Sequence, residues 1–250
     1  MDKIEIFGIK FDNLSMEEVL EKIKGFFIDN GQHYIVLPYS EFVVRAQKDE
    51  EFRKILNEAD FCLCEGRGLY LMARLLGKKL KENIFGVELI YNLVKKSEIR
   101  NPKSETNSKF QIQNSKFFLF GGTEKVVEIT AKKLGDSIIG FEHGYQDLDK
   151  VIEEINEKKP EILLVGLGSP MQEKWIYYNL YKMPSVKLAI GVGGAFDFIS
   201  GRVKRAPKII QKIGLEWLWR LIVQPRRFQR IFIGVGGLIL LTFKNMLSLK

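Results

Sequence analysis

Carboxylates and a tyrosine that follow apolar, strand-like runs are the residues of this 250-residue chain best suited to chemistry. Glu65 directly follows the run Phe61–Cys64, where a carboxylate could act as a general base. Asp197 lies between two phenylalanines in a glycine-flanked loop and would suit a ribose contact, and Tyr145 would suit stacking on a base. The alternatives are a helix cap or first-turn acid for Glu65, an Asx turn for Asp197 and a core ring for Tyr145.

Glycine-bearing turns follow five of the predicted strands. They contain Gly66 and Gly68, Gly121 and Gly122, Gly144, Gly166 and Gly168, and Gly193 and Gly194. Glycine lets backbone amides approach a phosphate, and a helix N-terminus adds a favourable dipole. Glycine is also ordinary punctuation between strands and helices, but five such turns at one sheet edge favour a nucleotide site. None completes G-x-G-x-x-G or G-x-x-x-x-G-K-[ST], so the pattern does not indicate a dinucleotide or P-loop protein.

Further polar residues lie next to these turns. Gln172 and Glu173 open the helix predicted after Gly168, so both could face the same cleft, although Glu173 could also be a favourable first-turn charge. His143 is one of only two histidines, and an isolated histidine is more often a structural hydrogen-bonding group than a ligand. We expect no structural metal, because the sequence offers no histidine cluster that could supply a metal site.

Short apolar strands alternate with helices along the chain, and these elements must position the polar residues. Strands are predicted at 4–9, 34–37, 61–64, 117–120, 138–141, 162–165 and 188–192. Helices are predicted at about 15–27, 42–56, 69–76, 87–96, 125–134, 148–157 and 172–180. Near-continuous apolar strands between helices are typical of a parallel sheet covered on both faces. The sequence therefore predicts an α/β, Rossmann-like fold.

The charge is unevenly distributed. Of 39 Lys and Arg and 31 Asp and Glu, residues 202–250 hold eleven bases and one acid, which leaves 28 bases and 30 acids for the remainder. We therefore divide the chain into a core, 1–201, and a cationic C-terminal appendage, 202–250, that requires an anionic partner. The polar segment 97–116 is predicted to be an exposed, mobile insertion in the core. Cys62 and Cys64 are too close along one strand to bridge, so a reducing cytoplasm is expected.

The appendage combines cations with a short apolar run. Ile231–Phe243 spans thirteen residues, whereas crossing a bilayer takes roughly 20. Trp217 and Trp219 precede it, and Arg227 and Arg230 lie within one helical turn of each other. This arrangement favours an interfacial helix on an anionic membrane, and the alternative is an amphipathic helix that closes the core.

Several motifs together resemble the WecG/TagA/CpsF glycosyltransferases. They are Phe120-Gly-Gly122, His143-Gly-Tyr145, Val165–Trp175, Gly191–Phe198, Gly201–Pro207 and Gly214–Arg220, in the family's order and spacing. The resemblance covers nearly the whole chain apart from 97–116. It implies a metal-independent, inverting enzyme without a cofactor, peripheral on the cytoplasmic membrane face. Such an enzyme moves an N-acetylhexosamine-type sugar from a UDP-sugar to a polyprenyl-diphosphate-linked sugar in cell-surface polysaccharide synthesis.

The resemblance also implies roles for individual residues. Tyr145 and Asp197 would contact the uridine part of UDP, Gln172 would line the active site, and Glu65 stands where the family has its catalytic aspartate. The C-terminal arginines of the family match Arg220, Arg227 and Arg230. Gly168, Gly193, Gly194 and Glu173 complete the predicted substrate-binding set.

The first half of the chain departs from the family pattern. Thr-Pro-Asn is replaced by Leu37-Pro38-Tyr39, the aspartate by Glu65, and an arginine by Asn83. A second hypothesis is therefore a catalytically impaired relative that binds UDP-sugar and membrane as a regulatory or assembly subunit. A third, a nucleic-acid-binding protein, is disfavoured because the apolar run Ile231–Phe243 does not suit DNA, so no nucleic-acid partner is expected. The oligomeric state, including a homo-oligomer, stays open.

Overall fold

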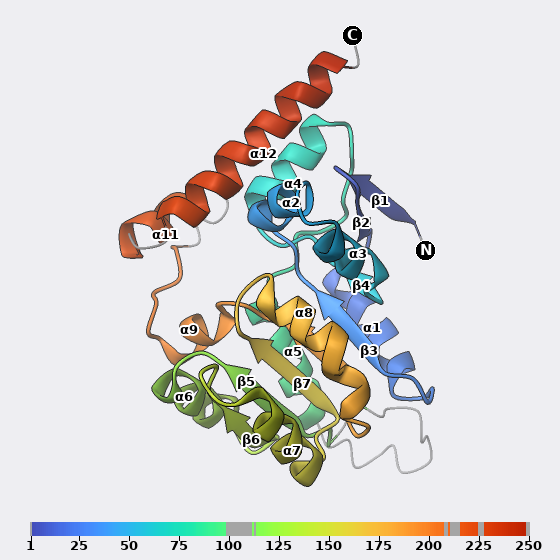
Figure 1. The fold of residues 1–250 in the computed structure, drawn as a ribbon, viewed down its shortest axis with the longest axis vertical. Coiled ribbons are helices and arrows are strands. Elements are labelled where there is room, and N and C mark those ends of the chain that lie inside the picture. The colour runs from blue at the N-terminus through green and yellow to red at the C-terminus, as the bar shows by residue number, and fades with distance from the viewer. Residues whose placement is uncertain are drawn as a thin grey trace. The chain divides into compact units, whose positions relative to one another are not determined.

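The computed structural model describes residues 2–98, 112, 114–207, 210, 216–224 and 228–248 (Figure 1). These residues form two compact units. Unit 1 contains Met1–Ser15, Val36–Phe85 and Val203–Lys250, and unit 2 contains Met16–Ile35 and Gly86–Arg202. The C-terminal segment is thus grouped with the first half of the chain, whereas the sequence suggested an appendage to a single core.

A six-stranded sheet is the main framework, in the order β4-β3-β8-β7-β5-β6. Its strands are β3 His33–Val36, β4 Phe61–Cys62, β5 Phe117–Gly121, β6 Ile138–Glu142, β7 Ile162–Gly166 and β8 Leu188–Gly191. Neighbouring strands from β3 to β6 pair in parallel. The central strands are buried along nearly their whole length, which explains why their sequences are almost continuously apolar. The predicted α/β fold with a parallel sheet is confirmed.

The strand order determines on which face of the sheet the helices of unit 2 lie. They are α1 Met16–Phe26, α5 Gly86–Glu98, α6 Glu124–Leu134, α7 Leu148–Lys158, α8 Met171–Asn179, the short 3-10 helix η1 Leu180–Lys182 and α9 Ala195–Ser200. The connection from β5 to β6 runs one way across the sheet, and those from β6 to β7 and β7 to β8 run the other way. Right-handed crossovers therefore place α6 on one face and α7 and α8 on the opposite face. Figure 1 shows α8 in front of β7 and α5 behind it.

Unit 1 begins with an antiparallel hairpin, β1 Lys3–Ile6 and β2 Ile9–Asp12, where the sequence suggested one strand. Phe7 and Gly8 both have positive φ, as a tight two-residue turn requires. The predicted helix 42–56 is two helices, α2 Ser40–Ala46 and α3 Glu50–Glu58. They separate because the Asp49 carboxylate caps α3 by accepting the Phe52 N–H at 2.9 Å.

Unit 1 further contains α4 Arg67–Leu75, α11 Glu216–Val223 and α12 Phe228–Ser248. α12 packs on α2 and α4, and its 21 residues extend well beyond the apolar run seen in the sequence. None of the helices in the described ranges is long and apolar enough to cross a membrane.

Of the polar segment 97–116, the structure describes residues 97, 98, 112 and 114–116. α5 continues through Glu98, and Ser97, Ile112 and Ser115 are buried. Residues 99–111 and 113 lie outside the described part of the chain, and with them most of the predicted insertion.

Candidate active site

The predicted site residues fall into both units. Glu65 and the C-terminal arginines belong to unit 1, and the other predicted residues belong to unit 2. Four of the five glycine-bearing turns follow β5, β6, β7 and β8 in unit 2, and the fifth follows β4.

β5 and β7 are neighbours in the sheet, and from their carboxyl ends the chain continues in opposite directions along the strand order. Their chains leave toward opposite faces of the sheet, and in open α/β sheets such a switch point is where ligands bind. Gly121 and Gly166 are register partners there, and the Gly122 N–H donates to the Gly166 carbonyl at 3.2 Å. The Gly144 N–H donates in turn to the Gly122 carbonyl at 2.9 Å, which ties the β6 turn to the same place.

The glycines of these turns divide into two kinds. A Cβ on Gly121, Gly166 or Gly191 would lie less than 3.0 Å from a neighbouring group, and one on Gly144 would lie 3.0 Å from Leu167 Cδ2. Close packing favours glycine at these positions, and at Gly121 the positive φ favours it further. Gly168 and Gly193, by contrast, have positive φ of 81° and 52° and no group closer than 3.9 Å to where a Cβ would lie. These two are the better candidates for a backbone that approaches a ligand.

Gln172 connects the turns after β7 and β8. Its Oε1 accepts the N–H groups of Gly168 and Gly193, each at 3.0 Å, and its Nε2 donates to Glu173 Oε1 at 2.6 Å. Both side chains are buried. This geometry suits Gln172 as a positioning residue for the two glycine turns and Glu173 as its support. The predictions that Gln172 lines the active site and that Glu173 faces the cleft stay predictions.

Asp197 lies in a helix and not in the loop that the sequence suggested. It is in the first turn of α9, whose N-cap residue is Gly194, directly after the Gly193 turn. Its partly buried carboxylate is 3.5 Å from Arg202 Nη1. The sequence did not single out Arg202. Its ion pair with Asp197 brings a cation next to this carboxylate, in the segment that follows β8.

Tyr145 is 81% exposed, which excludes the alternative of a core ring. Its N–H donates to His143 Nδ1 at 3.2 Å, and the two rings lie 6.3 Å apart. Because its turn is tied to the switch point through Gly144, the exposed ring is placed where stacking on a base would be useful.

Glu65 occupies the turn between β4 and α4 in unit 1. Its N–H donates to the Pro38 carbonyl at 2.9 Å, and the N-cap of α4 is Gly66. Glu65 therefore neither caps this helix nor lies in its first turn, so the structural alternatives considered for it do not apply. The side chain is half-buried, and its role as a general base stays a prediction.

The thiols beside Glu65 are not candidates for nucleophiles. Cys62 and Cys64 are free and buried. Burial raises the pKa of both thiols, and the Glu65 carboxylate raises that of Cys64 further.

Residues that depart from the family pattern lie close to Glu65 along the chain or through backbone contacts. Leu37 is buried, and the Tyr39 hydroxyl donates to Glu41 Oε2 at 2.9 Å. Neither polar atom of the Asn83 side chain has solvent access or a hydrogen bond within the described ranges. The Ile84 N–H beside it donates to the Cys64 carbonyl at 2.9 Å.

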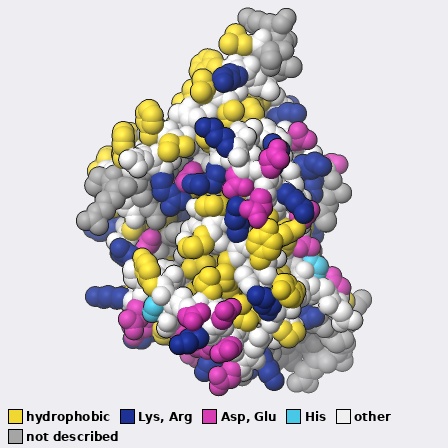
Figure 2. Space-filling model, viewed as in Figure 1, with side chains coloured by type: hydrophobic (Ala, Val, Ile, Leu, Met, Phe, Trp, Pro, Cys, Tyr) yellow, Lys and Arg dark blue, Asp and Glu magenta, His cyan; other side chains and the backbone are white. Residues whose placement is uncertain are grey.

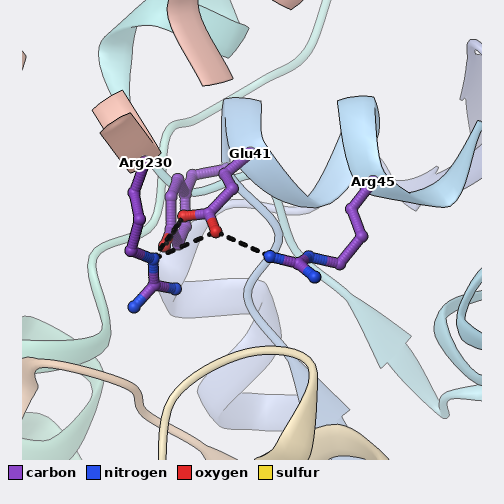
Figure 3. Close-up of polar contacts among 4 residues, drawn as sticks. Glu41, Arg45 and Arg230 are labelled. Carbon is purple, nitrogen blue, oxygen red and sulfur yellow. Dashed lines mark hydrogen bonds and ion pairs between the residues drawn. The ribbon is translucent and has the colours of Figure 1, made fainter. Parts of the chain in front are cut away.

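The C-terminal arginines are described to different extents. Arg230, on α12, donates from Nε to both carboxylate oxygens of Glu41, at 3.1 and 3.2 Å (Figure 3). Arg220 belongs to α11, but its side chain lies outside the described atoms, and so does the whole of Arg227. The sequence did not single out Glu41, whose only signal is an acid among apolar residues of α2.

A sequence profile of the glycosyl transferase WecG/TagA/CpsF family matches residues 4–250. The chain belongs to this family. Its similar relatives include the N-acetylglucosaminyldiphosphoundecaprenol N-acetyl-beta-D-mannosaminyltransferases of Staphylococcus aureus strains NCTC 8325 / PS 47, COL and MRSA252. Each is 31% identical over 237 residues, which cover 92% of this chain and 88% of the relative. The family resemblance seen in the motifs is thus confirmed, and the glycosyl transferase fold carries its motifs at the ends of β5 to β8.

Proposed function

We propose that this glycosyl transferase moves an N-acetylhexosamine-type sugar, in the first instance N-acetylmannosamine, from its UDP derivative to a polyprenyl-diphosphate-linked N-acetylglucosamine. The observation that carries the proposal is the similarity over 92% of the chain to relatives named for that transfer. The switch point in unit 2 supports the donor half, because Tyr145 and Asp197 offer a stacking surface and a carboxylate for ribose hydroxyls.

In the proposed reaction Glu65 takes the proton from the acceptor hydroxyl. The oxygen attacks the anomeric carbon while the bond to the UDP oxygen breaks, so the configuration inverts and UDP leaves with the bonding electrons. Arginines, Arg230 among them, would stabilise the leaving diphosphate without a metal. Measuring UDP release from a panel of UDP-sugars, with acceptor and with or without EDTA, tests both the transfer and its independence of metal. Release that requires both acceptor and metal would contradict metal independence.

A second candidate is a binding-only relative, and one observation favours it. Leu37 is buried and apolar, and the Tyr39 hydroxyl is engaged by Glu41, so two positions that carry Thr and Asn in the family pattern present different chemistry. UDP binding without turnover of any UDP-sugar would support this alternative.

Replacing Asp197 tests the donor half. We expect Asp197→Ala to weaken UDP binding about ten- to a hundredfold, because loss of one charged hydrogen-bonding partner costs about 1–3 kcal/mol. Calorimetry with UDP measures the change, and Asp136→Ala, which removes an exposed carboxylate of the same unit, is the control. Unchanged UDP affinity in Asp197→Ala would contradict the assignment.

The proposal also places the enzyme on an anionic membrane surface through residues 202–250. Large apolar side chains are exposed along α11 and α12, and Figure 2 shows hydrophobic side chains gathered along α12. They are Leu218, Ile222, Val223, Phe228, Phe232, Ile233, Ile239, Leu240, Phe243 and Leu247. An exposed apolar row on a cationic segment is suited to the boundary between headgroups and acyl chains.

The double variant Phe232→Gln/Phe243→Gln should lose most sedimentation with phosphatidylglycerol vesicles. These rings are 66% and 62% exposed, so their replacement removes buried area from the bound state without affecting the core. The matched control is Ile28→Gln/Tyr181→Gln, whose side chains are 63% and 72% exposed in unit 2. Equal sedimentation of both variants would contradict membrane binding through α12.

A further inference from the structure

Glu41, the second residue of α2, is a buried carboxylate that the proposed reaction does not use. It is 5% exposed and accepts three donors within unit 1: the Tyr39 hydroxyl at 2.9 Å, Arg45 Nη2 at 3.2 Å and Arg230 Nε at 3.1 Å (Figure 3). A buried carboxylate is tolerated only when it is paired and hydrogen-bonded, so these contacts are mutually dependent.

The same part of α2 is where α12 docks. A Cβ on Gly234 would lie 3.1 Å from the Glu41 backbone nitrogen, and one on Gly237 would lie 2.7 Å from Val44 Cγ1. Leu238 and Thr242 are buried on the same side of α12. The backbones of the two helices therefore approach closely, and this approach sets where the Arg230 side chain begins.

The way in which Glu41 engages Arg230 decides what the contact can do. Both carboxylate oxygens are within hydrogen-bonding distance of Nε, while the terminal nitrogens of the guanidinium lie on the side away from Glu41 (Figure 3). Because the guanidinium is planar, holding Nε fixes the direction of the terminal fork, which is the part that matches phosphate oxygens. The contact thus orients Arg230 through its Nε, an atom that phosphate recognition by the terminal nitrogens does not require.

We propose that Glu41 is the positioning residue for Arg230 and directs its guanidinium to a diphosphate. This inference rests on the proposed function, in which the diphosphate belongs either to the leaving UDP or to the lipid-linked acceptor. Tyr39, which replaces the asparagine of the family pattern, donates to the same carboxylate, so the departure at this position becomes part of the device that holds Arg230.

The test is a double-mutant cycle of Glu41→Gln and Arg230→Ala, read as KM for each substrate. Glu41→Gln should raise the KM for one diphosphate substrate about tenfold, as expected when a charged hydrogen bond no longer orients its partner. We expect kcat to stay within about twofold if Arg230 serves the acceptor diphosphate, and to fall as well if it serves the leaving UDP. In the Arg230→Ala background the same substitution should have no further effect on that KM. Comparing the two KM values identifies which diphosphate Arg230 serves.

Control variants separate positioning from folding. Glu58→Gln removes an exposed carboxylate that pairs with Lys54 at 3.8 Å on α3, and should leave both KM values unchanged. Tyr39→Phe removes only a hydroxyl and should raise the same KM as Glu41→Gln, by a smaller factor, even if Glu41→Gln fails to fold. Additive effects in the cycle, or an unchanged KM in both Glu41→Gln and Tyr39→Phe, would overturn the inference.

A binding readout keeps this inference distinguishable from the proposed function. The same cycle is run by calorimetry with UDP and with farnesyl diphosphate. Wild-type binding of either probe with a non-additive cycle, but without turnover, would retain the role of Glu41 while the transfer reaction fails. Wild-type protein that binds neither probe would overturn both.

Discussion

Glu65→Gln is expected to lower turnover by about 10²–10⁴ while leaving UDP affinity nearly unchanged. Glutamine keeps the size and hydrogen-bonding capacity of the side chain but cannot accept the proton of the acceptor hydroxyl. Glu65 does not cap α4, and its backbone N–H, which donates to the Pro38 carbonyl, is unchanged in glutamine.

Initial rates with saturating donor and acceptor measure this effect, and UDP calorimetry with the variant checks that the donor half is intact. Glu58→Gln serves as the control for loss of a carboxylate in unit 1. Glu65→Asp shortens the side chain to the family's residue and should be slower if the pocket has adapted to glutamate, since small misplacements of a base are costly. Wild-type turnover in Glu65→Gln would show that another group is the base.

Gly121→Ala is expected to destabilise the protein by about 2–6 kcal/mol, which combines backbone strain with overpacking. Gly121 has φ of +130°, and a Cβ there would overlap the carbonyl group of Gly166 and lie 2.8 Å from its Cα. Because the obstruction is backbone from the neighbouring central strand, no side-chain rotation can relieve it. The two strands that define the switch point would have to separate.

Gly168→Ala is the matched control, since φ is +81° there but nothing lies within 4 Å of its would-be Cβ. It should show the cost of positive φ alone, about 1–2 kcal/mol. Urea unfolding of both variants measures the difference. Equal stability of Gly121→Ala and Gly168→Ala would contradict the close packing of β5 on β7.

The fold was predictable from the sequence because burial on both faces leaves a plain pattern. Strands such as Phe117–Gly121 are apolar at nearly every position, and glycines end them. Two elements were predicted incorrectly, each at a place where a single side chain or a few backbone angles determine the local structure. The Asp49 carboxylate divides one expected helix into α2 and α3, and the positive φ of Phe7 and Gly8 turns one expected strand into a hairpin.

The positions of the candidate site residues at strand ends could be predicted from the sequence, but their side-chain contacts could not. The rule that ligands bind at strand ends led to Tyr145, Gly168 and Gly193, which follow β6, β7 and β8 in the structure. It could not show that Gln172 is buried and accepts two backbone N–H groups, because one of these, from Gly193, lies 21 residues away along the chain, although the other, from Gly168, lies only four away. Likewise, the pairing of Glu41 with Arg230 links residues 189 positions apart, and no local pattern predicts it.

The measurement that tests the transfer most directly is mass spectrometry of the lipid acceptor after incubation with the full chain and UDP-N-acetylmannosamine. A short-chain polyprenyl-diphosphate-N-acetylglucosamine serves as acceptor, and EDTA is present throughout. We expect the acceptor to gain one N-acetylhexosamine residue, with UDP released in equal amount and with both products lost in Glu65→Gln. An acceptor of unchanged mass across the whole panel of UDP-sugars, from a protein that still binds UDP, would contradict the transferase and leave the binding-only relative.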